Sequence, residues 1–240
     1  MLRKYTDKFL KMDRRIIFAL LTLVMFIPLI KPLGLPNKVI GVSGQQVYDF
    51  IENLKPGAFV LISLDYDPST RPELHPQAKA VIRHCFRKDL RVAVMTFLPG
   101  STGLIEEIFA TIPQEYNKKE GVDYVVFPYQ PNPVAVMTQL GSNIYSMYDK
   151  DKNKNPTKTM PVMRGITNYN DMGFVMCITG TALLDFWVAY VGDKFHVPMM
   201  GGVTAVSQPS YGPYLQKGQL KGLIGGMKGA ADYEKVLLKE

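Results

Sequence analysis

The sequence predicts an α/β domain with a mainly parallel sheet, preceded by one N-terminal transmembrane helix. Three observations predict this fold class. Residues 16–30 form an apolar run without a charge, IIFALLTLVMFIPLI. After this run, short apolar stretches alternate with segments of helical periodicity, an order typical of parallel sheets flanked by helices. The strand-like stretches are apolar throughout, as in strands that are buried on both faces.

The apolar run is interpreted as a membrane anchor over residues 16–35. These twenty residues carry one charge, Lys31, and at about 1.5 Å per residue they match a hydrocarbon core of about 30 Å. A cleaved signal peptide and a buried core helix are the alternatives. The segment that follows offers no A-x-A-like cleavage site, which favours an uncleaved anchor.

The tail over residues 1–15 sets the expected orientation. It holds six Lys or Arg and two Asp, so the positive-inside rule predicts a cytoplasmic N-terminus and an extracytoplasmic domain over 38–240. Leu2, Tyr5, Phe9 and Met12 are spaced as one stripe of a helix. The tail is therefore either a basic amphipathic helix on the inner leaflet or a solvated segment.

Residues 38–240 read as helices and strands in alternation. Ser43 and Gln46 match a capping box at the start of the first helix, which ends near Leu54. Helices are then expected over 75–88, 101–116, about 131–148 and 181–191, and strands over 58–65, 91–97, 123–128, 174–179 and 197–204. These five strands predict a single Rossmann-like or flavodoxin-like three-layer domain. A second transmembrane helix over 174–191 is the alternative, although Gly180-Thr181 and Asp185 interrupt it.

Polar residues follow three of the expected strands. In open parallel sheets, ligands bind beyond the carboxyl ends of the strands. If the strand order reverses between the first and fourth strands, the loop after the fourth strand faces Asp65. The candidate ligand-binding residues are Asp65, Asp67, Ser101, Thr102, Thr179 and Thr181. The alternative is that these residues only form turns and helix caps.

Histidine and cysteine give no catalytic or metal-binding pattern. His75 and His84 are nine residues apart, which places them on opposite faces of one helix. Cys85 and Cys177 lie in a helix and a strand that face the core, as buried thiols do, and a disulfide between them stays open. We therefore expect no catalytic residue, no metal and no cofactor.

The C-terminal segment is rich in glycine. Gly218, Gly222, Gly226 and Gly229 are three or four residues apart, and Tyr214 precedes them. On one helix these glycines form a bare stripe of the kind that packs closely against another helix. The stripe then packs on the chain's own sheet or on a partner, unless glycine turns divide the segment into two short helices. If the stripe packs on a partner, the candidate partner interface consists of Tyr214, Gly218, Gly222, Gly226 and Gly229.

Charge and composition exclude several classes of protein. The chain has 28 Lys and Arg against 21 Asp and Glu, a net charge of +7. Since the tail over 1–15 contributes +4 of this excess, the remaining residues carry only +3, and we expect no nucleic-acid partner. Hydrophobic residues make up 47% of the chain, which excludes intrinsic disorder.

The predicted function is that of a membrane-anchored, non-catalytic binding or assembly subunit of a membrane protein complex. Its expected partners are the lipid bilayer and either another membrane protein or further copies of the chain. The alternative is a membrane-anchored enzyme or small-ligand-binding domain with its site at the carboxyl ends of the strands. The sequence leaves the question of catalysis open.

Overall fold

The computed structural model describes residues 13–31 and 41–238, which belong to two separate units, 1–39 and 40–240. In the first unit, helix α2 (Arg14–Ile30) begins after Asp13, whose carboxylate accepts a hydrogen bond of 2.9 Å from the Arg15 N–H. The predicted amphipathic tail falls mostly on residues 1–12, which lie outside the described residues.

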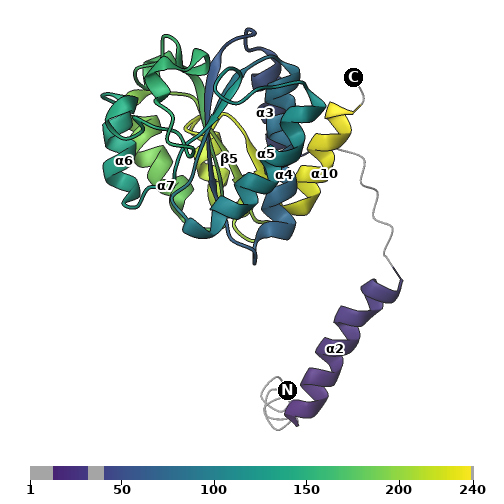
Figure 1. Ribbon diagram of the computed structural model, residues 1–240. Coiled ribbons are helices and arrows are strands. Elements are labelled where there is room, and N and C mark those ends of the chain that lie inside the picture. The colour runs from purple at the N-terminus through teal and green to yellow at the C-terminus, as the bar shows by residue number, and fades with distance from the viewer. Residues whose placement is uncertain (1–12, 32–40, 239–240) are drawn as a thin grey trace. The chain divides into compact units, whose positions relative to one another are not determined.

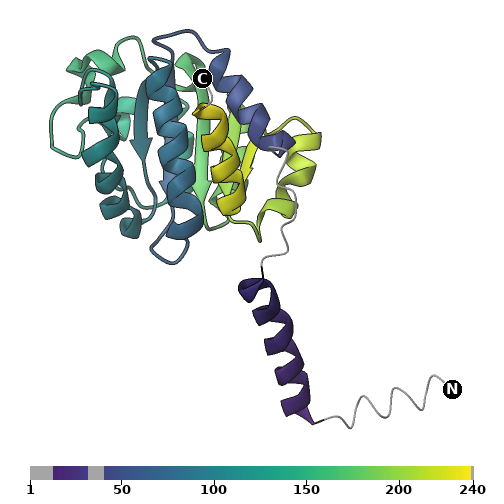
Figure 2. The ribbon, with the colours of Figure 1, turned by 90° about the vertical axis from the view of Figure 1, so that its right-hand side faces the viewer.

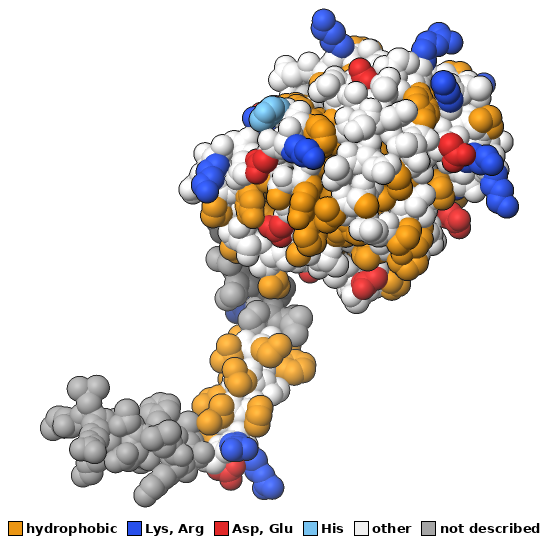
Figure 3. Space-filling model, turned by 90° about the vertical axis from the view of Figure 1, so that its left-hand side faces the viewer, with side chains coloured by type: hydrophobic (Ala, Val, Ile, Leu, Met, Phe, Trp, Pro, Cys, Tyr) orange, Lys and Arg blue, Asp and Glu red, His pale blue; other side chains and the backbone are white. Residues whose placement is uncertain are grey.

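Helix α2 carries many large apolar side chains. Eleven of them are exposed, and Figure 3 shows hydrophobic side chains along the helix surface. Within residues 13–31 and 41–238, however, no helix combines the length and the hydropathy needed to cross a membrane. The structure therefore does not support the predicted transmembrane helix over 16–35: α2 has 17 residues, and positions 32–35 are outside the described ones.

The second unit is an α/β fold built on one six-stranded sheet. All five strand pairings are parallel, and the strand order is β3-β2-β1-β4-β5-β6. The strands are β1 (Phe59–Asp65), β2 (Arg91–Met95), β3 (Tyr124–Val126), β4 (Met172–Thr179), β5 (Met199–Val203) and β6 (Leu223–Gly225). The prediction of a mainly parallel Rossmann-like sheet is confirmed, with one strand more than expected.

Helices cover both faces of this sheet (Figures 1 and 2). One face packs on α3 (Val42–Glu52), α4 (Arg71–Arg87), α5 (Thr102–Glu115) and α10 (Gly226–Leu237). The other packs on α6 (Pro133–Leu140), α7 (Leu183–Trp187), the π-helix η6 (Val188–Gly192) and irregular chain. Side chains alternate along β1, so Val60 and Ile62 face the first layer while Phe59 and Leu61 face the second.

The irregular chain contains several short elements. They are η1 (Pro99–Ser101), η2 (Ile144–Ser146), η3 (Thr157–Thr159), η4 (Pro161–Met163), η5 (Tyr169–Asp171), α8 (Asp193–Phe195), η7 (Gln208–Tyr211) and α9 (Gly212–Gln216). The helix that the sequence predicted over about 131–148 is shorter, because α6 ends at Leu140 and η2 follows it.

The structure departs from the sequence analysis at the start of α3 and decides two alternatives that the sequence left open. The N-cap of α3 is Gly41, which has no side-chain cap, and Ser43 lies inside the helix, so the predicted capping box does not form. Residues 174–191 are divided among β4, α7 and η6, as the predicted strand and helix require, so the alternative of a second apolar helix is wrong. Gly218, Gly222 and Gly229 do not share one helix, because a turn and strand β6 precede α10.

Candidate functional site

The strand order reverses between β1 and β4, which places their carboxyl ends side by side. Asp65 and Thr179 are direct partners in the β1–β4 register. The Thr179 Oγ1 hydroxyl donates a hydrogen bond of 3.0 Å to the Asp65 carbonyl. This is the topological switch point at which doubly wound sheets commonly bind ligands.

The Asp65 carboxylate lies inside the protein and is fully buried. Its oxygens accept hydrogen bonds from the Ser63 hydroxyl at 2.5 Å, the Phe97 N–H at 2.6 Å and the Thr96 hydroxyl at 3.2 Å. The Cys177 thiol is 3.9 Å from the same carboxylate. The side chain therefore ties β1 to the end of β2 and to β4, and it does not point into solvent.

Burial governs the ionisation of Asp65. Removal of the carboxylate from water raises its pKa to about 6, although the donors Ser63, Phe97, Thr96 and Cys177 act in the opposite direction. None of these donors carries a charge, so each stabilises the carboxylate less than a cation would. Asp65 thus takes up a proton more readily than an exposed aspartate but has no path to a bound molecule.

Asp67 is the exposed carboxylate of the loop after β1. Its Oδ1 accepts hydrogen bonds from the Ser69 N–H at 2.9 Å and the Ser69 hydroxyl at 2.6 Å, and a longer one of 3.3 Å from the Thr70 N–H. These bonds, led by that of the Ser69 hydroxyl, lower the pKa of Asp67. The side chain closes its own turn and keeps its second oxygen available at the surface.

The next loop contains two further candidates with different surroundings. The buried Ser101 hydroxyl donates to the Tyr66 carbonyl at 2.7 Å and accepts from the Tyr66 N–H at 3.1 Å. Thr102 is exposed and donates to the Pro99 carbonyl at 2.8 Å. Ser101 therefore joins the loops after β1 and β2, whereas Thr102 only closes its own turn.

The loop after β4 approaches the loop after β1. A Cβ atom on Gly180 would lie 2.9 Å from the Thr70 side chain, so the absence of a side chain permits this contact. The Thr181 N–H donates to Thr179 Oγ1 at 3.0 Å, and the exposed Thr181 hydroxyl lies at the same distance from it. Asp67, Thr70 and Thr181 are thus among the polar side chains that this edge presents to solvent.

The structure brings some predicted residues together and adds others. Asp65 and Thr179 meet directly, and Ser101 reaches them through Tyr66, while Thr102 stays apart. Sequence reasoning missed Ser63, Thr96 and Cys177, which surround the Asp65 carboxylate. One signal was available: Ser63 and Asp65 are two apart on a strand buried on both faces, so they share one buried side.

A hollow of about 210 Å³ lies further along the same edge, at the ends of β5 and β6. Gly41 and Ser43 of α3, Ala205 after β5, and Gly225 and Gly226 before α10 contribute to its walls. Gly226 has φ = +61°, and a Cβ atom at this position would lie 2.8 Å from the Cβ atom of Ala205. Glycine at this position lets the two loops touch.

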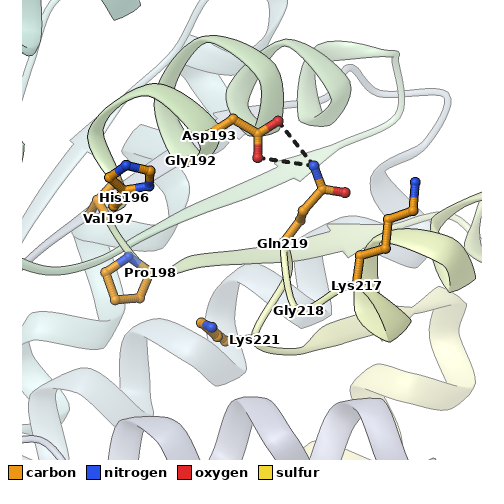
Figure 4. A pocket seen from close by; sticks show the side chains of 9 residues that line it. All are labelled: Gly192, Asp193, His196, Val197, Pro198, Lys217, Gly218, Gln219 and Lys221. Carbon is orange, nitrogen blue, oxygen red and sulfur yellow. Dashed lines mark hydrogen bonds between the residues drawn. The ribbon is translucent and has the colours of Figure 1, made fainter.

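A second cavity, of about 270 Å³, opens at the opposite edge of the sheet (Figure 4). His196 stands on one side, and Lys217 and Lys221 on the other. Asp193 accepts two hydrogen bonds of 3.0 Å from the Gln219 amide across it. None of its lining residues belongs to the predicted ligand-binding set.

The predicted interface residues lie in several environments. Gly218 is in a turn with open space around its Cα, and the Tyr214 hydroxyl donates to Asp185 at 2.9 Å. Gly222 packs against Val47 of α3, and Gly229 against Ile224. The glycines at 222, 226 and 229 therefore all make close contacts within the chain, and a partner contact at this segment stays a prediction.

The described residues contain no clustered metal ligands, and both of their cysteines are buried. Residues 13–31 and 41–238 contain no group of three His, Cys, Asp or Glu side chains arranged for a metal ion. Cys85 and Cys177 are both free and buried, so the disulfide that the sequence left open does not form. Burial raises the pKa of each thiol far above its usual range.

Similarity to known proteins assigns no function to this edge. Comparison with known proteins found no family model that matches the chain and no curated protein with significant similarity to it.

Proposed function

We propose that this chain is a membrane-attached α/β domain that serves as a binding or assembly subunit. The segment over residues 16–35 attaches it to a bilayer, with a cytoplasmic N-terminus and an extracytoplasmic domain. The exposure of α2 is the observation that carries this proposal. Its apolar side chains from Ile16 to Ile27 project in every direction around the helix, and a helix that is apolar all round needs an apolar environment.

A lipid bilayer is the environment that the flanking charges favour. Arg14 and Arg15 precede the apolar residues and Lys31 follows them, as interfacial anchors do. The 17 residues of α2 extend about 25 Å, somewhat less than a bilayer core. A span consequently needs residues beyond Ile30 or a locally thinned bilayer.

Flotation of the full chain with lipid vesicles tests the attachment. Leu21→Lys with Val24→Lys places two charges in the middle of α2, each costing about 3 kcal/mol in a bilayer centre. We expect this double variant to stay in the aqueous fraction while the wild type floats. Val122→Lys with Leu238→Lys adds the same charges at exposed apolar positions of the α/β domain and should still float. Equal flotation of both double variants would contradict the proposal.

The sidedness of the domain requires intact cells. Cys85 and Cys177 are buried, so a single engineered cysteine at the exposed Val122 reports on the domain alone. A membrane-impermeant maleimide should label Val122→Cys without permeabilisation. Labelling only after permeabilisation would place the domain in the cytoplasm and overturn the predicted orientation.

The assembly role is supported by an exposed aromatic pair. Phe186 and Tyr190 stack at 6.1 Å between ring centroids, and both stay about 40% exposed. They lie where α7 continues into the π-helix, a local widening that is often found at functional sites. Exposed aromatic side chains of this kind are typical anchors of protein interfaces.

Native mass after extraction in mild detergent tests this role. We expect a stoichiometric complex heavier than one 27.0 kDa chain with its detergent. Phe186→Asp with Tyr190→Asp should release the complex, while the Val122→Lys and Leu238→Lys control should retain it. A single chain in the wild-type extract would contradict the assembly role.

A small-ligand site at the carboxyl ends of the strands is the second candidate. The switch point between β1 and β4 and the hollow of about 210 Å³ favour it. A screen of small anions, nucleotides and sugars for thermal stabilisation tests this candidate. A ligand at the switch point should lose its effect in Asp67→Ala, and a ligand in the hollow should lose its effect in Gly229→Leu. Absence of any stabilising ligand counts against it.

A further inference from the structure

An exposed apolar pair adjoins the point where the described domain begins. Val206 is 89% exposed and Met227 is 60% exposed. They follow Ala205 and Gly226, and a Cβ atom on Gly226 would lie 2.8 Å from the Cβ atom of Ala205, so the two side chains stand on adjoining loops. With Lys228 they form what we call the edge patch.

The edge patch borders the hollow that Gly41 also lines. Gly41 is the first described residue after Lys31. With residues 16–35 in the bilayer, as proposed above, six Cα–Cα steps join Leu35 to Gly41 and reach at most about 22 Å in any conformation. A domain of this size is about 40 Å across. If the segment before Gly41 is attached to a bilayer, contact between the edge patch and the lipid is therefore favoured over contact between the opposite edge of the domain and the lipid.

The edge patch holds one cation and adjoins two acids. Lys228 is exposed and cationic, and its ammonium pairs with Asp232 at 2.7 Å. Glu73 is the other nearby acid, and its carboxylate accepts the Ala205 N–H at 2.7 Å. Both acids are therefore engaged within the protein. Two apolar side chains beside a lysine form the arrangement by which surface segments enter the headgroup region.

We propose that the edge patch docks against the lipid surface that holds residues 16–35, which rests on the membrane attachment proposed above. The docked domain has the carboxyl edge of β5 and β6 at the membrane. Its opposite edge, where Val122 and Leu238 are exposed, faces away from the membrane. The hollow beside Gly41 then opens at the headgroup layer, and Val206 and Met227 insert into the bilayer surface.

Two matched pairs of single-cysteine variants test this docking in the full chain. Val206→Cys is compared with Val122→Cys, and Met227→Cys with Leu238→Cys, which lies just beyond the other end of the same helix. The buried Cys85 and Cys177 stay unlabelled. Each variant carries an environment-sensitive fluorophore and is bound to vesicles of phosphatidylcholine with one quarter phosphatidylglycerol. Nitroxide-labelled lipids quench a fluorophore that touches the bilayer.

We expect severalfold stronger quenching at positions 206 and 227 than at 122 and 238. Equal quenching within both pairs, on protein that floats with the vesicles, overturns the docking and leaves the attachment intact. Failure of all variants and of the wild type to float overturns both proposals. Val206→Glu with Met227→Glu, labelled through an added Ala205→Cys, should float normally and lose the quenching seen with Ala205→Cys alone. Quenching that persists in the triple variant also counts against the docking.

Discussion

The two edges of the sheet each hold a buried or half-buried carboxylate, and their ionisation differs in direction. At the carboxyl edge, burial raises the pKa of Asp65 to about 6. At the amino edge, burial alone would raise the pKa of Glu52, but hydrogen bonds from Lys88, His84 and Arg87 outweigh it and lower the pKa to about 2. The charge of the donors therefore decides the direction, because neutral donors at Asp65 do not compensate for desolvation.

The amino-edge cluster also joins three helices. Glu52 ends α3, and it accepts hydrogen bonds from Arg87, from His84 Nε2 at 2.7 Å and from Lys88 at 3.0 Å. His84 Nδ1 in turn accepts from the Tyr233 hydroxyl of α10 at 2.6 Å. Charge thus stabilises one edge, whereas neutral hydrogen bonds close the edge that holds the candidate site.

The largest effect is expected at Glu52. Glu52→Gln leaves Arg87 and Lys88 facing an uncharged amide in a half-buried site, and we expect a loss of about 3 kcal/mol in the free energy of unfolding. Urea denaturation at pH 7 measures it. Glu234→Gln is the matched control, since Glu234 is exposed and lies 3.8 Å from Arg83, and its loss should stay below about 0.5 kcal/mol. Equal losses would remove the distinction between the cluster and an ordinary surface pair.

An effect of opposite sign, and no larger in size, is expected at Asp65. Its folded pKa of about 6 exceeds the ordinary value of 3.8, so its contribution to stability is complete below pH 3.8 and is lost as the pH rises through 6. Asp65→Asn cannot ionise and avoids this loss. We expect the variant to gain up to about 3 kcal/mol over the wild type at pH 7.5 and nothing at pH 4. Destabilisation at both pH values would show that the donors require a carboxylate.

His84 supplies the opposite pH dependence, which sharpens this test. Burial lowers its pKa to about 4 from an ordinary value of 6.5, so stability is lost as the pH falls from 6.5 through 4. In the wild type this slope and that of Asp65 oppose each other. In Asp65→Asn the pH dependence of stability that comes from His84 is no longer opposed. His75, whose pKa is also lowered, contributes with the same sign. The stability of the variant should therefore rise with pH more steeply than that of the wild type between pH 4 and 6.5.

The sequence predicts the five strands that read as apolar runs and misses β6. β1, β2, β4 and β5 read as continuous apolar runs because both of their faces are covered. β6 has only three residues, and Gly222, Gly225 and Gly226 surround it, so its pattern resembles a glycine stripe. The structure shows instead that Gly222, just before β6, packs against Val47 of α3.

The candidate site was predictable in position but not in detail. A polar residue after each apolar run predicts the carboxyl edge correctly, because parallel strands end together. The burial of Asp65 depends on donors that are distant in the sequence: Thr96 is 31 residues away and Cys177 is 112 residues away. No local pattern encodes such a set, and only the strand order brings it together.

The smallest effect on stability is expected at Asp67, two residues from Asp65 but exposed. Asp67→Ala removes the acceptor for Ser69 and Thr70, and solvent can replace these bonds. Because the pKa of Asp67 is lowered, chiefly by the Ser69 hydroxyl, its contribution exists above the ordinary value of 3.8 and is lost as the pH falls further. The difference between the variant and the wild type in urea denaturation should therefore shrink as the pH falls below 3.8. Asp67→Asn keeps an acceptor and should stay closer to the wild type at pH 7. A loss as large as that of Glu52→Gln would make Asp67 a structural residue like Asp65, and the carboxyl edge would then present no carboxylate for a ligand between β1 and β4.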